Sequence, residues 1–397
     1  MQKPEAGRQQ SVSIPFDSDR LDILMEEAGV DVLLVTSKHN VQYMLGGHRS
    51  LFFSAMDAWG MSRYLPIVIY RKGKPEHSIY IGHFTERHQK AVRPFWMSES
   101  PTSVSGSEDA MRLALDYLRK FGIANKYIGI EPSFMPADAV LVLWECVPKN
   151  FIINACSLME KLRAIKSPRE LHMLREASER VVAAMLAVIA GHGPGTTKNE
   201  LCDALRREET NRALEFEYCL ITAGTNLNRA PSDQPWNRGD IMSLDSGGNY
   251  EGYIGDITRM AIMGEPDAEL EDLLAEIETL QQIAMRPLRA GLMGGEFYEM
   301  AETAVRRSPN ARHLEFLAHG MGLAAHEVPH LTATGPVPYP ADDAVRPLEA
   351  GMVLSVETTM KHPRRGFIKL EDTVAITNTG FEIFGAGGHG WNRGRHC

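Results

Sequence analysis

Four acidic residues interrupt segments that otherwise read as buried β-strands in the second half of the chain. Asp245 ends Ile-Met-Ser-Leu-Asp, and Asp256 follows in Gly-Asp-Ile-Thr-Arg. Glu357 lies in Val-Leu-Ser-Val-Glu-Thr-Thr, and Glu371 lies in Phe-Ile-Lys-Leu-Glu-Asp-Thr. A buried carboxylate must be paired or bound to a metal ion, because its desolvation is otherwise too costly. Few lysines or arginines neighbour these acids, so we predict divalent cations as their counter-charge.

A histidine between small residues supplies a fifth candidate ligand. His319 stands in Ala-His-Gly-Met-Gly, where Gly320 and Gly322 let the backbone approach closely, as a crowded metal site requires. Four carboxylates and one imidazole match Mn²⁺, Fe²⁺, Co²⁺ or Zn²⁺ in a two-metal site. Each of these residues alone has an ordinary structural explanation, a salt bridge, a helix cap or a satisfied core histidine. Their combination and spacing favour a metal centre.

The strands that carry these residues belong to a domain that also contains helices. Apolar and β-branched runs predict strands over 241–244, 253–263, 352–358 and 368–377. Antiparallel strands separated by helices imply an α+β domain, which we assign to residues 161–397.

Capping patterns mark where two of the helices begin. Ser167, Pro168 and Glu170 form a capping box with proline at the first helical position, and Gly191 ends the apolar periodicity that follows. Thr197-Lys-Asn-Glu repeats the capping box for a second helix. A third long helix follows Pro266.

The first part of the chain alternates helical and strand patterns. Residues 20–28 place apolar side chains at helical spacing, and a continuous apolar run to Val35 then predicts a buried strand. A helix over 110–122 and a strand over 127–130 repeat the alternation. We therefore predict an α/β domain over residues 1–160.

Composition excludes several classes of protein. The 397 residues are 44% hydrophobic and 23% charged, which is typical of a globular chain of more than one domain. The net charge of −9 argues against nucleic-acid and anionic-membrane binding. The five cysteines contain no Cys-x-x-Cys pair, and there is neither an apolar leader nor a long apolar run. We expect a cytoplasmic protein that binds neither nucleic acid nor membrane.

The order of the candidate ligands resembles metallopeptidase family M24, whose catalytic domain has the pita-bread fold. The matching positions are Asp245, Asp256, His319 in a His-Gly-x-Gly context, Glu357 and Glu371. Residues 162–171 and the segment Gly-Asp-Ile-Met-Ser-Leu-Asp-Ser-Gly-Gly look like the prolidase, Xaa-Pro aminopeptidase and creatinase-like branch. That branch implies an α/β creatinase-like N-terminal domain, followed by the α+β pita-bread catalytic domain.

The resemblance also implies roles for the five residues. Asp245 would bind one ion. Asp256 and Glu371 would bridge two ions, and His319 and Glu357 would complete the second. Two divalent ions per chain, Mn, Fe, Co or Zn, would activate a water as the nucleophile, and Glu357 would carry its proton. Creatinase itself works without this metal set, whereas all five positions are filled here.

Two histidine positions carry the expected substrate contacts. His326, in the pattern His-Gly-x-Gly-x-x-x-His-Glu-x-Pro, looks like the family's substrate-side histidine that stabilises the tetrahedral intermediate, with an exposed loop residue as the alternative. Proline-directed members carry another histidine upstream of the first metal aspartate, but none occurs here between residues 192 and 313. Asn228, Arg229 and Ser232 are the candidates to replace it, and arginine offers a fixed positive fork for a carboxylate.

An aromatic and arginine-rich segment in the first domain is a further candidate for substrate contact. In dimeric relatives the N-terminal domain of one subunit lines the active site of its partner. In a homodimer of this kind, the residues His48, Arg49, Trp59 and Arg63 would contact the substrate. Ordinary domain packing explains the same residues equally well.

Three functions are consistent with these features. The first is a dinuclear metallohydrolase that cleaves a C–N bond of a short peptide or amide, in the manner of an Xaa-Pro dipeptidase or aminopeptidase. The second is a related enzyme acting on a small metabolite, either an ectoine- or creatine-type amide hydrolase or a dimethylsulfoniopropionate-type C–S lyase. The third is a non-catalytic binding protein that keeps the fold.

Overall fold

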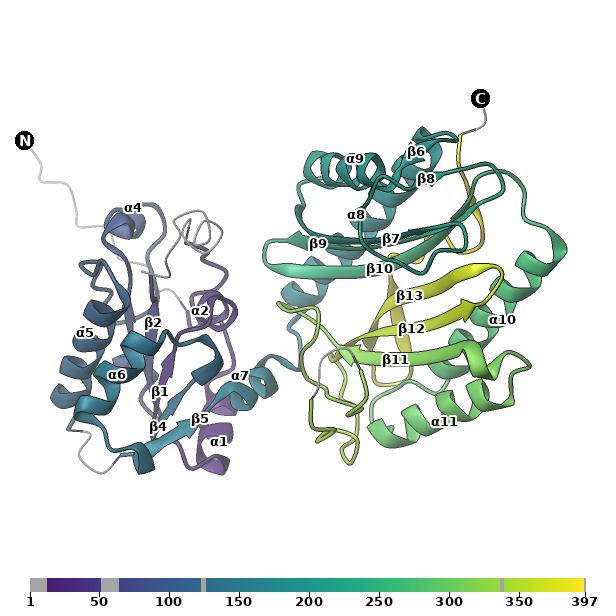
Figure 1. The fold of residues 1–397 in the computed structure, drawn as a ribbon. Helices are drawn as coiled ribbons and strands as arrows, with labels where there is room; N and C mark the ends of the chain where they lie inside the picture. The colour runs from purple at the N-terminus through teal and green to yellow at the C-terminus, as the bar shows by residue number, and fades with distance from the viewer. Residues whose placement is uncertain (1–12, 51–63, 123–125, 336–338, 396–397) are drawn as a thin grey trace, which may run out of the picture. The chain divides into compact units, whose positions relative to one another are not determined.

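The computed structural model describes residues 13–50, 64–122, 126–335 and 339–395. Contacts within the chain divide it into two compact units, Met1–Leu162 and Arg163–Cys397 (Figure 1). Each unit has its own sheet and its own buried core.

The first unit is a three-layer α/β structure. Its sheet has the strand order β3-β2-β1-β4-β5, in which β4 is parallel to β1 and β5. The strands are β1 (Val32–Val35), β2 (Ile67–Arg71), β3 (Ile79–Ile81), β4 (Ile128–Ile130) and β5 (Ile152–Asn154). The helices are α1 (Ser18–Glu27), α2 (Lys38–Met44), α4 (Gln89–Val92), α5 (Ser107–Lys120), α6 (Ala137–Cys146) and α7 (Cys156–Arg163).

The two faces of this sheet are covered by different helices. Val32 and Leu34 pack in one core with α5 and α6, whereas Leu33 and Val35 pack in another with α1, α2 and α7. All four residues of β1 are buried, as expected for a strand covered on both faces. The predicted α/β first domain is confirmed.

The second unit is built on one large, mostly antiparallel sheet. Its strand order is β11-β12-β13-β10-β9-β7, with β14 paired to β13 and β15 to β10. The strands of the unit are β6 (Thr196–Thr197), β7 (Glu215–Ala223), β8 (Pro235–Trp236), β9 (Ile241–Tyr250), β10 (Tyr253–Ile262), β11 (Leu314–Gly320), β12 (Val353–His362), β13 (Gly366–Ile376), β14 (Phe381–Phe384) and β15 (Asn392–Arg393).

Four helices cover one face of this sheet. They are α8 (Pro168–Gly191), α9 (Lys198–Asn211), α10 (Ala268–Met285) and α11 (Gly294–Arg307). The helices α8 and α9 pack on β7, β9 and β10, while α10 and α11 pack on β11, β12 and β13 (Figure 1). The predicted α+β architecture of the second domain is confirmed.

Both predicted capping boxes are present. The Ser167 backbone N–H donates to Glu170 Oε2 at 2.8 Å, and the Glu170 N–H donates to Ser167 Oγ at 3.4 Å. Thr197 and Glu200 make the same reciprocal pair at the start of α9. These caps satisfy backbone donors that the first turn of a helix otherwise leaves without partners.

The sequence did not predict several elements of the second unit. The strands β7 and β11 are missing from the predicted set, although they form the two ends of the main strand path. Helix α11 was missed as well.

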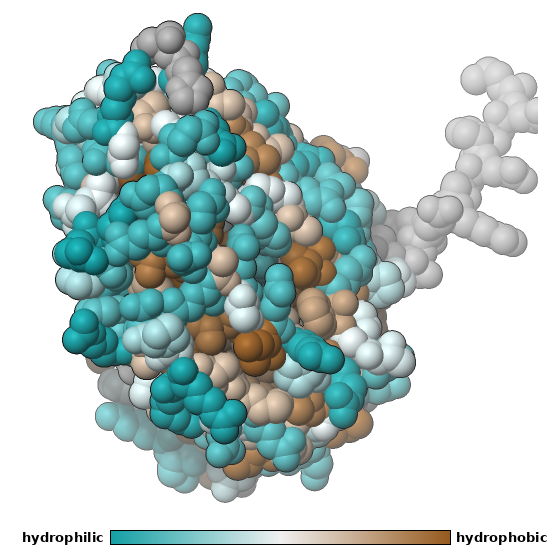
Figure 2. Space-filling model, turned by 90° about the vertical axis from the view of Figure 1, so that its right-hand side faces the viewer, coloured by the Kyte–Doolittle hydropathy of each residue, from teal (hydrophilic) through white to brown (hydrophobic). Residues whose placement is uncertain are grey.

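Hydrophobic residues appear in small areas between hydrophilic ones on the face drawn in Figure 2. None of the helices within the described ranges combines the length and the apolar character that crossing a bilayer requires.

Candidate metal centre

Five adjacent strands each contribute one of the five candidate ligands. In sheet order these residues are His319 on β11, Glu357 on β12, Glu371 on β13, Asp256 on β10 and Asp245 on β9. Strand register brings them together, because Glu357 lies directly opposite Glu371, and Thr258 lies opposite both Glu371 and Asp245. Asp245, Glu371 and Glu357 therefore lie at one level of the sheet, while Asp256 and His319 each lie two residues further along their strands.

Strand alternation explains why all five point to the same face. Their chain neighbours Leu244, Ile257, Val356 and Leu370 are buried in the cores beneath the helices. Since successive side chains of a strand point to opposite faces, the ligands point away from the helices. They line a cavity of about 790 Å³, together with Tyr218, Arg229 and His326.

Three of the five residues form a compact group of metal-ligand type. One ligand atom each from Asp256, His319 and Glu371 lies within 4.8 Å of the others, and all three residues are buried. Among the described residues, no lysine or arginine forms an ion pair with Asp256. Burial, together with the negative charges of Glu371 and Asp245, holds the pKa of Asp256 well above its usual range. Two carboxylates and an imidazole are suitable donors for a divalent transition metal, so these residues fit a resident ion.

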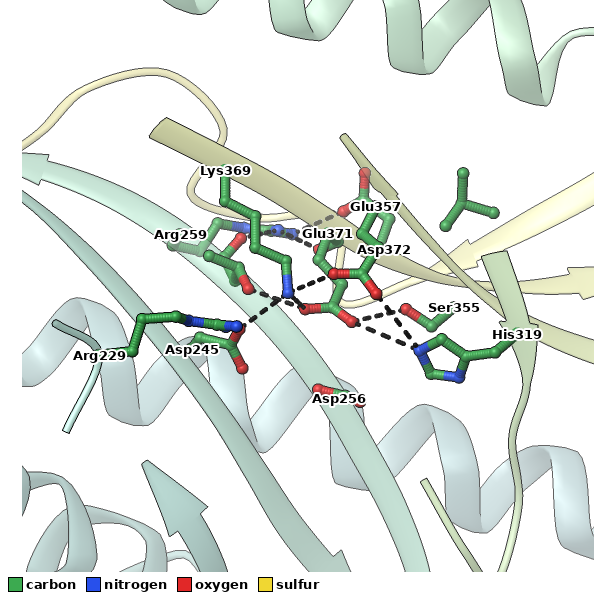
Figure 3. Close-up of polar contacts among 12 residues, drawn as sticks. Arg229, Asp245, Asp256, Arg259, His319, Ser355, Glu357, Lys369, Glu371 and Asp372 are labelled. Atoms are coloured by element: carbon green, nitrogen blue, oxygen red, sulfur yellow. Dashed lines mark hydrogen bonds and ion pairs between the residues drawn. The ribbon is translucent and has the colours of Figure 1, made fainter. Parts of the chain in front are cut away.

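A lysine lies among the remaining ligands. Lys369 Nζ lies 2.8 Å from Asp245 Oδ2, 2.9 Å from Glu371 Oε2 and 2.5 Å from Glu357 Oε2 (Figure 3). Burial would lower the pKa of Lys369, but these three carboxylates outweigh burial and raise it well above its usual range. The same contact helps to lower the pKa of Glu371 to about 2, against the effect of burial.

The expectation that these acids lack basic partners is therefore wrong. Lys369 stands two residues before Glu371 on β13, and alternation puts both side chains on the same face. Arg229 also reaches the group, since its Nη2 donates to Asp245 Oδ2. Asp245, Glu357 and Glu371 each have a cationic partner, and Asp256 alone among the four has none in the part of the chain that the structure describes.

Hydroxyl groups complete the surroundings of Glu371 and Asp256. Thr258 Oγ1 donates to Glu371 Oε2 at 2.8 Å, and Ser355 Oγ donates to Glu371 Oε1 at 2.7 Å. The Tyr218 hydroxyl hydrogen bonds Asp256 from β7. Gly247 makes room for this tyrosine, because a Cβ there would lie 2.3 Å from the Tyr218 ring. Tyr218 was not predicted from the sequence. The one sign of it there is Gly247 in Asp-Ser-Gly-Gly, whose missing side chain leaves space for a neighbouring ring.

His326 lies against His319. Their rings stack with centroids 3.8 Å apart and planes 20° from parallel. Burial and the neighbouring His319 lower the pKa of His326 to about 4, so its ring is neutral near pH 7. It lines the same cavity as the candidate ligands and is not an exposed loop residue.

The two glycines after His319 serve a different purpose from the expected one. A Cβ on Gly320 would lie 2.3 Å from the Val328 carbonyl carbon, and a Cβ on Gly322 would lie 2.2 Å from Glu327 Oε1. These glycines admit the segment that follows His326, rather than the metal site itself. Glu327 in turn is buried between Arg163 and Lys166, an ion triad that sequence reasoning did not find.

Arg229 is the candidate that faces the carboxylates where the family has a histidine. Its guanidinium lies 5.1 Å from the centre of the Phe367 ring while it contacts Asp245. Asn228 is exposed, and its side chain accepts a hydrogen bond from the Ala230 N–H. The Ser232 hydroxyl accepts one from the Gln234 N–H. Of the three, only Arg229 lines the cavity.

Arg259 is a further residue whose importance the sequence did not reveal. It is fully buried and donates hydrogen bonds to the carbonyl oxygens of Glu371, Gly385 and Gly387 and to the Asp372 carboxylate. Arg259 thereby ties the ligand-bearing strand β13 to β10 and to the C-terminal segment.

The structure describes two of the four candidates from the first domain, His48 and Arg49. His48 Nε2 lies 3.0 Å from Glu86 Oε1, and the His48 ring packs edge-on against Phe95. Arg49 is partly buried in the same unit. Trp59 and Arg63 lie outside the described residues. Contact of these four residues with substrate stays a prediction.

Comparison with known proteins identifies the family of the chain. Residues 172–378 match the model of metallopeptidase family M24, and residues 18–165 match the creatinase/prolidase N-terminal domain. The chain belongs to metallopeptidase family M24. The family resemblance, the creatinase-like and pita-bread architecture and the expectation of an enzyme are confirmed, and the alternative of a non-catalytic binding protein is not supported.

Individual relatives are distant but cover nearly the whole chain. An uncharacterized peptidase of Bacillus subtilis is 25% identical over 91% of this chain and 95% of its own length. An Xaa-Pro dipeptidase of Pyrococcus horikoshii is 23% identical over 90% of this chain and 93% of its own length. Among solved structures, an Xaa-Pro dipeptidase from Bacillus anthracis superposes with a TM-score of 0.80 at 22% identity, covering 95% of this chain and 98% of its own. At these identities the superposition shows a shared fold.

Proposed function

We propose that this protein is a metal-dependent peptidase that hydrolyses the bond before proline in short peptides, as an Xaa-Pro dipeptidase or aminopeptidase. The observation that carries the proposal is the set of five ligand-type side chains, one from each of five adjacent strands, on the wall of one cavity. Relatives named Xaa-Pro dipeptidase and X-Pro aminopeptidase support the choice of substrate.

The group that would hold an ion includes Asp256, the one acid of the four without a lysine or arginine partner among the described residues. Asp256, His319 and Glu371 supply the compact donor group, with Asp245 and Glu357 beside it. Mn, Fe, Co and Zn all accept such donors. A divalent cation, when bound, supplies the Lewis acidity that activates a water and polarises the scissile carbonyl. The family resemblance predicts two such ions per chain. Lys369 contacts three of the candidate ligands and therefore affects how many ions can bind.

Two residues of the cavity act on the reacting groups. Glu357 is 12% exposed at the cavity wall, where it takes up a proton from the attacking water and returns it to the leaving amine. His326 is neutral and donates a hydrogen bond to the negative charge that develops on the carbonyl oxygen. Arg229 binds the substrate carboxylate through its fork of N–H donors.

Arg229 also favours a second candidate function. It occupies the region where proline-directed members carry a histidine, and an arginine cannot exchange protons near neutral pH as a histidine can. A small carboxylate-bearing metabolite, cleaved at an amide or a C–S bond, would use the same centre with this different recognition residue.

A substrate panel tests both candidates. We expect metal-loaded protein to hydrolyse Xaa-Pro dipeptides, with a rate that rises on addition of Mn²⁺ or Co²⁺ and is lost in Asp256→Ala. Asp203→Ala, on the exposed face of α9, is the matched control and should keep full activity. Turnover of small N-acyl or sulfonium metabolites without peptide hydrolysis would select the second candidate. Failure of folded, metal-loaded protein on both panels would refute both.

A homodimer, a cytoplasmic location and the absence of nucleic-acid or membrane partners stay predictions. Size measurement in solution tests the first of these. In a homodimer, His48, Arg49, Trp59 and Arg63 should affect the Michaelis constant when each is changed to alanine.

A further inference from the structure

The two glutamates of the centre present their oxygens to two different side chains, His319 and Lys369. Glu357 Oε1 lies 3.7 Å from His319 Nε2, while Glu357 Oε2 lies 2.5 Å from Lys369 Nζ. Glu371 divides in the same way, with Oε1 4.0 Å from His319 Nε2 and Oε2 2.9 Å from Lys369 Nζ. Figure 3 shows His319 and Lys369 on opposite sides of the glutamates.

Each of the three N–H donors of the Lys369 ammonium has a carboxylate partner. An ammonium has three N–H donors, and Lys369 Nζ has one carboxylate oxygen within 3 Å on each of β9, β12 and β13. Its side chain is only 5% exposed, so water does not supply an alternative solvation shell. Withdrawing the ammonium from this position would leave a buried charge without partners, which is strongly unfavourable.

Charge balance matches a single divalent ion. The four carboxylates carry four negative charges when ionised, and Lys369 together with Arg229 offsets two of them. The remaining two negative charges equal the charge of one divalent cation. A second divalent ion would have to lie within a few ångströms of the ammonium, in contact with the same oxygens, and at that distance in a buried site the repulsion is large.

We propose that this centre binds one divalent ion per chain, at Asp256, His319 and Glu371, and that the Lys369 ammonium stands in the place of a second ion. The inference rests on the proposed metal dependence but not on the choice of substrate. It replaces the prediction of two ions that the family resemblance carries, because the chain supplies one of the two positive charges from its own strand β13.

Counting bound ions tests the proposal without an activity measurement. Protein stripped with a chelator and dialysed against Mn²⁺ should contain one ion per chain by elemental analysis. Lys369→Met removes the ammonium and frees oxygens of three carboxylates, so it should bind two ions. Lys369→Arg keeps the charge and should bind one. Lys361→Met removes a lysine that lines the same cavity but pairs with Glu315, at 2.6 Å, rather than with a candidate ligand, and it should also bind one.

Two ions in the wild-type protein, none at millimolar Mn²⁺, or a single ion in folded Lys369→Met would each overturn the proposal. If Lys369→Met fails to fold, electron paramagnetic resonance of the wild-type protein decides, since one isolated Mn²⁺ gives a six-line signal and a coupled pair gives a multiline signal. Wild-type protein that binds one ion but hydrolyses no Xaa-Pro peptide would keep this proposal and refute the proposed function.

Discussion

Replacing Glu327 by glutamine removes one charge from the buried ion triad beside the metal centre. Glu327 Oε2 accepts a hydrogen bond from Arg163 Nη2 at 2.7 Å, and Glu327 Oε1 accepts one from Lys166 Nζ at 3.0 Å. The three side chains are at most 5% exposed. Glutamine keeps the shape of the side chain but leaves two buried cations without a counter-charge, so the second unit should lose stability.

Two independent estimates give a similar magnitude for this loss. Burial would raise the pKa of Glu327, but Lys166 and Arg163 outweigh burial and lower it from 4.5 to about 2. That difference corresponds to about 3 kcal/mol of unfolding free energy. Removing one partner of a buried pair costs about 3–5 kcal/mol in general. For a unit of this size, about 3 kcal/mol lowers the melting temperature by about 6–12 °C.

Calorimetry at pH 7 measures this effect on the melting transition of the second unit. Glu382→Gln is the matched control, because Glu382 pairs with Arg175 at 2.7 Å but is 53% exposed. The control should shift the melting temperature by less than about 4 °C, since exposed pairs contribute about 0–1 kcal/mol. Equal shifts in the two variants would refute the assignment of a buried triad.

The pH dependence of the Glu327→Gln effect has a definite sign. The carboxylate has a lowered pKa in the folded state, so its stabilisation is complete above about pH 5 and is lost as the pH falls from 4.5 toward 2. The advantage of the wild type over Glu327→Gln should therefore fall to about half by pH 3. An advantage that stays constant over this range would contradict the charge-based explanation.

Two further variants test buried polar groups near the centre. Glu209 is fully buried, with Oε1 2.7 Å from Ser246 Oγ, and burial raises its pKa to about 8. Because the folded state retains this proton after the unfolded state has lost it, wild-type stability should fall by about 3–5 kcal/mol between pH 4.5 and 8. Glu209→Gln should lack this fall in urea denaturation across that range, and parallel wild-type and variant curves would refute the raised pKa. Arg259→Met removes the donors to four carbonyl oxygens and to Asp372, and should cost at least about 3 kcal/mol by thermal denaturation. Arg259→Lys should recover little of this loss, because an ammonium cannot reproduce the guanidinium fork, and full recovery would show that the charge alone matters.

The grouping of the five candidate ligands could be predicted because it depends on patterns within single strands. An acid inside an apolar strand pattern is conspicuous, and strand alternation fixes the face on which it lies. The same rule puts Lys369 on the face of Glu371, two residues away, so its presence among the carboxylates was available from the sequence and was overlooked.

The rest of the site depends on contacts between residues far apart in the chain. Tyr218 reaches Asp256 because β7 pairs with β9. The residue pattern of 215–223 does not indicate which strand this segment pairs with. Arg163 and Lys166 meet Glu327 across more than 160 residues, so the partner of that buried acid could not be named in advance. Gly320 and Gly322 marked a close approach correctly, but the approaching group was a neighbouring segment rather than an ion.

Anomalous diffraction from crystals soaked in Mn²⁺ tests most directly whether this face of the sheet is a metal centre. We predict one strong anomalous peak among Asp256, His319 and Glu371, with Lys369 Nζ still in contact with Asp245 and both glutamates. Absence of a peak at that position, in crystals that contain millimolar Mn²⁺, would contradict the metal centre and the metal-dependent activity built on it.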